Sequence, residues 1–572
     1  MSRVSGLVLG TSLLLLLAAG CGGAAPPPVA TPSGSASAAA SEPPIGATLT
    51  AFAKGAALIA DLGTHHRAVT ATSTDAQAFF DQGLRLTYGF NHDEAARSFA
   101  RGAEIDPGCA MCFWGVAYTL GPNYNIPMLP DRAKGAWEAI TRAQRAVGVS
   151  GTAVEKALIS ALAKRYKGPE YVDPVGMAAF NLAYADAMRG VAHQFPDDDD
   201  VQVLFAEALM NLNPWKLWTS DGRPADGTVE IVSTLEDVLG RAPTHPGANH
   251  YYIHAVEASK NPGRALASAD RLGGLMPAAG HLVHMPAHIY QRVGKYAQAS
   301  EANRRAIVAD EAYLAKLTPP GYYPFYLSHN HGFLAFSTSM EGKSAESLAA
   351  ATKSAGTMPK DVVCGMPGMD FFWSEPLLVM VRFGRWDDIL AAPRPDAKYA
   401  ALTALWHHAR GMALASKGHP TEARAELAEI QRIGKEVPAD LLTGLNAGKA
   451  VLDVAGKVLE ARIAEAEKNP GAIELWEAAV VAEDALSYNE PADWFYPVRH
   501  YLGAALLDAK RAKEAEKVYR ADLARNPGNG WSLFGVWKSL EAQKRKKDAT
   551  AAEAEFKKAW PAPDLQLTRS AF

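Results

Sequence analysis

From residue 48 onward, apolar and polar positions follow the spacing of amphipathic helices. Ala, Leu, Glu, Lys and Arg recur at three- and four-residue intervals, and the β-branched runs that indicate strands are scarce. The amino terminus differs, because an apolar run extends from Leu7 to Ala19. This run is shorter than the roughly 20 residues that a bilayer-spanning helix needs, so it fits the apolar part of an export signal. The pattern predicts an all-α body behind a short apolar leader.

Small, aromatic and proline residues repeat at fixed offsets within this helical body. One copy consists of Gly83, Leu86, Ala95, Phe99 and Pro107, and a second of Leu502-Gly503, Leu506, Ala515, Tyr519 and Pro527. Ala549 and Pro561 continue the second copy one repeat later. Over most of its length after residue 48 the chain resembles the tetratricopeptide repeat (TPR) family. The resemblance implies helix pairs stacked into a right-handed superhelical solenoid, and it implies a protein or peptide partner.

Composition divides the chain into four predicted parts. Residues 1–21 end in Leu-Ala-Ala-Gly-Cys, which resembles a bacterial lipobox, and residues 22–47 form a tether of Ala, Gly, Pro and Ser with one charge. Residues 48–355 are expected to form an N-terminal array with a histidine-rich groove, and residues 356–572 a C-terminal array. The lipobox resemblance implies a lipid-modified Cys21 that anchors the protein in the bacterial cell envelope, at the outer membrane, facing the periplasm or the exterior. The alternative is a plain secretory signal with a chance cysteine.

Charge and motifs exclude several classes of function. The formal net charge of −4 provides no global basic field, so no nucleic-acid partner is expected. Four cysteines in 572 residues rule out a disulfide scaffold. The chain has no GxxxxGK[ST] loop, no GxGxxG after a strand and no CxxCH signature, so neither a nucleotide nor haem is predicted. Cys109 and Cys112 form a CxxC pair, and a static disulfide or two buried thiols fit an exported chain better than a redox pair.

Half of the 16 histidines lie between His245 and His331. Two pairs, His250 with His254 and His284 with His288, have i, i+4 spacing and therefore share a helix face. Equivalent members are separated by one TPR length, about 34 residues, so they occupy equivalent sites on neighbouring repeats. His281 joins the second stripe and His329 aligns with it in the next repeat. Pro286 lies inside the second motif and is tolerated only in a first helical turn, which suggests that His281 precedes the helix.

The TPR resemblance places this stripe on the concave face of the array. The implied groove is lined by His250, His254, Glu257, His281, His284, His288, Gln291 and His329. Facing helices pack about 8–10 Å apart, so side chains from two of them can converge on one ion. The expected ligands are His250, His254, His284 and His288, with His281, His329 and His331 as further candidates. Imidazole ligands suit Cu, Zn, Fe or Ni. Polar ligand recognition without a metal, and plain structural packing, remain open.

Two irregular inserts interrupt the repeats, at residues 121–130 and 214–226, and both are expected to form loops at the rim of the array. The sequence supports three hypotheses for function. The first is an exported, lipid-anchored TPR protein that binds a partner or ligand in its groove, with a transition-metal site on adjacent repeats. The second is a metalloenzyme, for example an oxidoreductase, built on the histidines. The third is a purely structural envelope lipoprotein.

Overall fold

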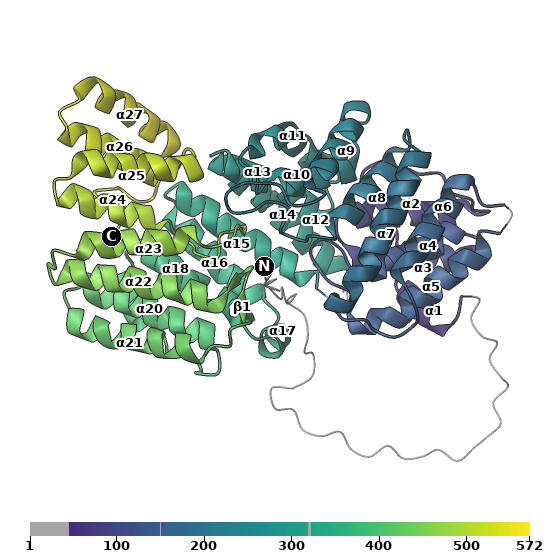
Figure 1. The fold of residues 1–572 in the computed structure, drawn as a ribbon, viewed down its shortest axis with the longest axis horizontal. Helices are drawn as coiled ribbons and strands as arrows, with labels where there is room; N and C mark the ends of the chain where they lie inside the picture. The colour runs from purple at the N-terminus through teal and green to yellow at the C-terminus, as the bar shows by residue number, and fades with distance from the viewer. Residues whose placement is uncertain (1–44, 149, 318–321) are drawn as a thin grey trace, which may run out of the picture.

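The computed structural model describes residues 45–148, 150–317 and 322–572 (Figure 1). The predicted signal segment 1–21, its Cys21 and the tether up to residue 44 lie outside the described residues. Ile45 is fully buried and α1 (Ala47–Ala53) begins two residues later, so residues 45–47 belong to the folded body rather than to the tether. Among the described residues, no helix combines the length and the apolar character needed to cross a bilayer.

The first half of the chain folds into helices that pack in consecutive antiparallel pairs. Their bounds are α2 Thr74–Tyr88, α3 His92–Ile105, α4 Ala110–Leu120, α5 Ala133–Ala146, α6 Ala153–Leu162, α7 Pro174–Gln194, α8 Asp199–Met210, α9 Thr228–Arg241, α10 Pro246–Val256, α11 Leu266–Leu275, α12 Gly280–His284, α13 Pro286–Arg292 and α14 Tyr296–Lys316. Short 3-10 turns lie at Pro130–Arg132, Ala163–Arg165 and Pro262–Ala265.

The second half continues the same arrangement. Its helices are α15 Pro324–Met340, α16 Ser344–Thr357, α17 Lys360–Gly365, α18 Glu375–Arg382, α19 Trp386–Ala391, α20 Ala400–Ser416, α21 Pro420–Glu436, α22 Gly448–Ala466, α23 Ala472–Asp484, α24 Val498–Asp508, α25 Ala512–Arg525, α26 Gly530–Ala542 and α27 Lys546–Ala559. A 3-10 turn covers Met369–Ser374, and two-residue strands β1 (Leu442–Thr443) and β2 (Asn446–Ala447) pair antiparallel. The chain is an all-α, TPR-like helical solenoid.

The repeated small residues explain why neighbouring helices pack so closely. The ring of Phe99 on α3 lies against Gly83 of α2 and Gly115 of α4, and a Cβ atom at either glycine would collide with it. Near the end of the chain, Tyr519 on α25 is held in the same way between two glycines of α24 and α26. An aromatic ring between two glycines on flanking helices is therefore the packing unit that the repeat motif encodes.

The turns inside the helix pairs share one backbone conformation. In eight of the pairs, the first helix is followed by one residue in the left-handed region, and it is glycine at positions 294, 342, 384 and 418. Glycine adopts this region without steric strain, whereas for other residues it costs about 1–2 kcal/mol. Exposed lysines occupy the same position at 468, 510 and 544, and the aromatic Phe90 occupies it between α2 and α3.

The C-terminal helix pairs return to the middle of the solenoid. Trp531 on α26 donates its indole N–H to the carbonyl of Ser339 on α15 at 2.9 Å. The carboxylate of Asp564 accepts the backbone N–H groups of Ser344 and Ala345 at the start of α16. Arg292 of α13 reaches the carbonyl of Arg525. Consequently, the ends of α13 and α15 and the start of α16 are packed against the C-terminal part of the chain.

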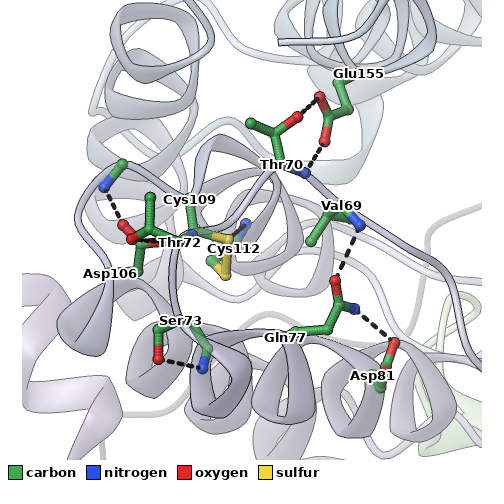
Figure 2. The surroundings of a disulfide bond; sticks show 12 residues. Val69, Thr70, Thr72, Ser73, Gln77, Asp81, Asp106, Cys109, Cys112 and Glu155 are labelled. Carbon is green, nitrogen blue, oxygen red and sulfur yellow. Dashed lines mark hydrogen bonds between the residues drawn. A yellow bond between two sulfur atoms is a disulfide. The ribbon is translucent and has the colours of Figure 1, made fainter. Parts of the chain in front are cut away.

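Cys109 and Cys112 form a disulfide at the start of α4 (Figure 2). Both cysteines are fully buried, and the Cys109 Sγ also accepts the backbone N–H of Cys112 as the helix N-cap. Nearby, the extended segment before α2 is fastened by Thr72 to Asp106 and by Thr70 to Glu155. The disulfide thus lies in a rigid, buried corner, which is the setting of a static bond rather than of an accessible redox pair.

Candidate metal centre

The predicted histidine pairs lie on α10 and on the α12–α13 segment. Residues 250 and 254 share a face of α10, and Glu257 is the C-cap residue that follows this helix. Pro286 does interrupt the second motif, since α12 ends at His284 and α13 begins at Pro286. Met285 between them keeps right-handed helical dihedrals, so the i, i+4 relation to His288 survives. As expected, His281 precedes the helix that Pro286 begins, but it is itself helical, as the second residue of α12.

The structure sorts six of the histidines into two groups of three. Cluster A consists of His250, His254 and His281, and cluster B of His284, His288 and His329. Within each cluster, one potential ligand atom from every residue lies within 4.8 Å of the other two. The two clusters are adjacent, with ring centroids 5.7 Å apart between His254 and His288. The four expected ligands therefore do not form one site, because each i, i+4 pair is completed by a histidine from a later helix, His281 on α12 or His329 on α15.

Four of these imidazoles have their Nδ1 atoms next to fixed hydrogen-bond acceptors. His250 donates to the carbonyl of Tyr88 at 2.6 Å, and His284 donates to Oδ1 of Asn303 at 2.6 Å. His254 and His288 donate to the two oxygens of Glu257, at 2.8 and 2.5 Å. An imidazole that donates from Nδ1 keeps its lone pair on Nε2. This is the outer-shell arrangement that orients metal-ligating histidines in proteins.

The acceptors themselves are held in place. Asn303 donates its amide N–H to the carbonyl of Ala299 at 2.8 Å, one turn earlier in α14, which turns Oδ1 toward His284. Burial by itself would raise the pKa of Glu257, but the adjacent rings of His288 and His254, which both donate hydrogen bonds to its carboxylate, lower it to about 2. Glu257 is therefore a carboxylate at neutral pH, and it can only accept hydrogen bonds from the two rings.

Several ring nitrogens of the clusters are buried and lie within 4.8 Å of one another in each cluster. Nε2 of His250, Nε2 of His254 and both ring nitrogens of His281 have no hydrogen-bond partner among the described residues. Nε2 of His284 lies 2.9 Å from Nε2 of His288, and both atoms carry lone pairs in the tautomers assigned above. Leaving buried polar atoms unpaired costs about 1–3 kcal/mol each. An ion bound at about 2.0–2.1 Å would satisfy these atoms together.

Burial favours the neutral form, which is the form that binds metals, in five of the six rings. It lowers the pKa of His250, His281 and His284 well below the usual range, and repulsion from neighbouring imidazoles adds to the effect. Burial and the charge of His288 lower the pKa of His329 to about 3. Burial also lowers the pKa of His288, although Glu257 opposes the shift. Protons therefore do not compete for these nitrogens near neutral pH.

Aromatic side chains cover both clusters. Phe90 lies 4.6 Å from the ring of His250 and stacks on His254 and His281, and Tyr326 lies 4.4 Å from His281. The two inserts that sequence reasoning placed at the rim meet over cluster A through Tyr124 and Trp215, which both contact His254. Phe333 packs against all three rings of cluster B, 4.6 Å from His284 and His288 and 5.0 Å from His329.

Two of these covering residues have a strained backbone. Phe90 has φ 52° and Trp215 has φ 60°, in the left-handed region that bulky residues avoid. Phe90 stands at the turn position that glycine occupies in four other helix pairs. Strain of this kind persists only where the surrounding structure enforces it, and it concentrates at functional sites. The chain therefore keeps a bulky ring at this turn despite the steric cost, and this ring packs against the three imidazoles of cluster A.

The remaining candidates have different surroundings. Gln291 is buried, and its Oε1 has no hydrogen-bond partner among the described residues. His331 belongs to neither cluster; burial and the nearby charge of Lys353 lower its pKa to about 4. Of the residues expected to line an open groove, only His329 keeps partial exposure, and the others are buried. The C-terminal array adds Glu490, whose Oε2 lies 3.3 Å from Nδ1 of His288.

A third group of potential ligands, His65, Asp200 and His245, opens into a pocket of about 510 Å³. Its atoms already satisfy one another. Nδ1 of His245 accepts the backbone N–H of Ala248, so Nε2 carries the proton and donates to Asp200 at 3.1 Å. Asp200 also accepts hydrogen bonds from Tyr88 and Arg67. This group therefore fits a structural network better than a metal site.

Sequence reasoning missed the residues that support and cover the clusters. Asn303, Phe90, Phe333 and Glu490 come from segments whose approach depends on packing between repeats. One signal was readable in advance. The repeat register aligns Phe90 with the turn glycines, so a bulky residue at that position marks a place where the chain tolerates strain.

Comparisons with known proteins do not name a family. No family model matches the chain, and no curated protein matches it. Solved structures similar to it include the human IFIT1 dimer with PPP-AAAA, at 14% identity over 86% of this chain and 96% of that chain, with a TM-score of 0.35. The human IFIT1 dimer with m7Gppp-AAAA matches at 14% identity over 79% and 90%, with a TM-score of 0.33. Naa15/Naa10 bound to HypK-THB matches at 12% identity over 84% and 70%, with a TM-score of 0.22. With TM-scores this low, the fold class rests on the helix pairs themselves.

Proposed function

We propose that this protein is a helical-repeat metalloprotein that binds transition-metal ions in its histidine clusters. One observation carries the proposal. Four imidazoles donate from Nδ1 to fixed acceptors, which leaves their Nε2 lone pairs free, and two further histidines complete the two groups of three potential ligands. Structural packing alone does not favour this arrangement, because it leaves unpaired nitrogens in the core. Metal ligation explains the tautomers, the burial and the missing partners together.

The test is elemental analysis of the full chain, purified without a histidine tag and reconstituted with Cu, Zn, Fe or Ni. We expect bound metal in the wild type and its loss in the His254→Ala/His288→Ala double variant. His408→Ala is a matched control, because His408 is also fully buried but both of its ring nitrogens have partners, the Ala455 carbonyl and the Tyr496 hydroxyl. A wild type without metal after reconstitution would contradict the proposal.

The proposal also places this protein in the bacterial envelope, anchored through Cys21 and residues 22–44. A protein or peptide partner is part of it, since helical repeat arrays present extended surfaces to partners. The burial of the histidines argues that such a partner binds elsewhere than on these side chains. Metabolic labelling with a fatty acid tests the anchor, and the Cys21→Ala variant should lose both the label and membrane association.

A further inference from the structure

We infer that the two clusters hold a pair of monovalent copper ions, one in each cluster, coupled through the shared carboxylate of Glu257. This inference rests on the proposed function and goes beyond it in the number, the identity and the coupling of the ions. The pattern of the sequence suggested a single ion held by the four i, i+4 histidines, whereas the packing gives each pair its own third ligand.

The arrangement of the rings supports two ions. Each cluster offers three imidazoles, and six imidazoles exceed the four ligands that a structural transition-metal site normally takes. His281 completes cluster A from α12, and His329 completes cluster B from α15. The clusters are nevertheless adjacent, because the ring centroids of His281 in cluster A and His284 in cluster B are 5.9 Å apart. Two ions in these positions would be close neighbours.

Glu257 connects the two clusters. Its Oε1 accepts from His254 of cluster A and its Oε2 from His288 of cluster B. A carboxylate behind a ligating histidine makes that ligand more basic and fixes its orientation. Because one carboxylate serves a ligand of each cluster, an ion in one cluster polarises a group that also supports the other. Loading of the two sites should therefore be interdependent.

Charge and solvent exclusion favour monovalent copper. Imidazole nitrogens carry no negative charge, and Glu257 and Glu490 place two carboxyl groups next to the clusters. Two divalent ions would therefore bury four positive charges beside two carboxyl groups. Uncompensated buried charge is strongly unfavourable, and two monovalent ions reduce the excess.

The aromatic rings that pack on the two clusters also favour copper. Zinc held by three histidines keeps a water molecule as its fourth ligand. Phe90 packs on cluster A and Phe333 on cluster B, so an apolar ring lies against the imidazoles of each cluster. Apolar surroundings suit an ion that is satisfied by three nitrogen ligands better than one that keeps a water molecule, and this favours copper over zinc.

Two further points concern the identity of the ion and the kind of ligand atom. Among the common divalent first-row ions, copper binds most tightly to imidazole-rich sites. Copper is therefore also expected to have the highest affinity if the bound ions are in the divalent state. Met366 and Met369 pack in a separate apolar cluster with Met358 and Val363, so a sulfur ligand from these residues is not expected. We therefore expect three nitrogen atoms to coordinate each ion.

The experiment titrates the full-length, tag-free protein with Cu(I) under anaerobic conditions in the presence of a competing Cu(I) chelator. The variants are His281→Phe for cluster A, which preserves the ring between Phe90 and Tyr326, and the partly exposed His329→Ala for cluster B. We expect two equivalents in the wild type and one in each variant. His331→Ala, two residues further along α15, is the matched control and should retain two. Circular dichroism establishes that each variant is folded.

Glu257→Gln tests the coupling. We expect it to weaken both sites by about 10- to 100-fold, the usual effect of removing an outer-shell partner. X-ray absorption should give a nitrogen-only shell. Binding of one equivalent that either cluster variant abolishes would overturn the two-ion inference while leaving metal binding intact. Weakening of only one site in Glu257→Gln would overturn the coupling, and two equivalents of Zn(II) bound more tightly than Cu(I) would overturn the identification of copper. No binding of any of these ions would defeat the proposed function itself.

Discussion

Tyr124 and Trp215 stack with their ring centroids 5.3 Å apart, and both contact the imidazole of His254. They come from the two irregular inserts, so segments far apart in the sequence together form the cover of cluster A. Asn125 of the first insert also contacts the hydroxyl of Tyr326, a residue that packs on His281. The inserts therefore pack on the histidine site and cover it.

Removing this cover should expose His254. In Trp215→Ala we expect faster modification of His254 by diethyl pyrocarbonate, measured by mass spectrometry on the metal-free protein. Loss of the large ring should also lower the free energy of unfolding by about 2–4 kcal/mol. Trp537→Ala, on α26, is the control and should leave the reactivity of His254 unchanged. Equal reactivity in all three proteins would show that the inserts do not shield the cluster.

The left-handed turn position predicts a stabilising substitution. Lys510 is exposed and has φ 63°, so Lys510→Gly should remove about 1–2 kcal/mol of steric cost. The greater freedom of glycine in the unfolded chain offsets part of this, which leaves a gain of about 0.5–1 kcal/mol. Lys517→Gly, in the middle of α25, should instead lose about 1 kcal/mol. Chemical denaturation of both variants measures the difference, and a loss at both positions would refute the turn argument.

Asp310 should make stability depend on pH. It is fully buried, where it accepts hydrogen bonds from Tyr323 and Asn330, and burial raises its pKa to about 7. Between the ordinary carboxyl pKa near 4 and this value, the folded state holds a proton that the unfolded state has lost. The contribution of Asp310 to the free energy of unfolding is therefore fully present below about pH 4. It decreases by about 1.4 kcal/mol per pH unit as the pH rises toward 7.

The Asp310→Asn variant should remove this part of the pH dependence. The measurement is the free energy of unfolding of wild type and variant at several values between about pH 4 and 8, the range that brackets the two pKa values. Glu301→Gln, an exposed position on the same helix, is the control and should keep the slope of the wild type. Parallel curves for the wild type and Asp310→Asn would mean that Asp310 is ionised throughout this range.

The buried disulfide predicts a modest contribution to stability and slow reduction. The bond closes a short loop, with a sequence separation of 3, for which chain entropy gives about 2 kcal/mol. Cys109→Ser/Cys112→Ala keeps an N-cap acceptor for α4 and should lose about this amount. In the native wild type, dithiothreitol followed by alkylation should label neither sulfur unless the protein is first unfolded. Rapid labelling of the folded protein would contradict the burial of the bond.

Local pattern was sufficient to predict the helix pairs. Residues three and four apart share a helix face, so apolar periodicity gave the helices, and the constant offset between copies of the motif gave the repeat. The same rule gave the pairing of His250 with His254 and of His284 with His288. The helix break at Pro286 was also readable, because proline cannot donate the hydrogen bond of a helix interior. The helical conformation of His281 was not predicted, and it arises because Met285 continues the helical path through the break.

The sequence by itself determined which side chains share a helix face, because that depends only on the rotation per residue along one helix. The tertiary structure alone decided which faces meet. It gave His281 to cluster A and His329 to cluster B, it placed Glu257 between His254 and His288, and it brought Phe90 over the rings. It also buried the histidines that the repeat pattern predicted to line an open groove, with the inserts packed on cluster A and Glu490 of the C-terminal array next to cluster B. These contacts join residues far apart in the chain, and their formation depends on the packing of whole helix pairs rather than on local spacing.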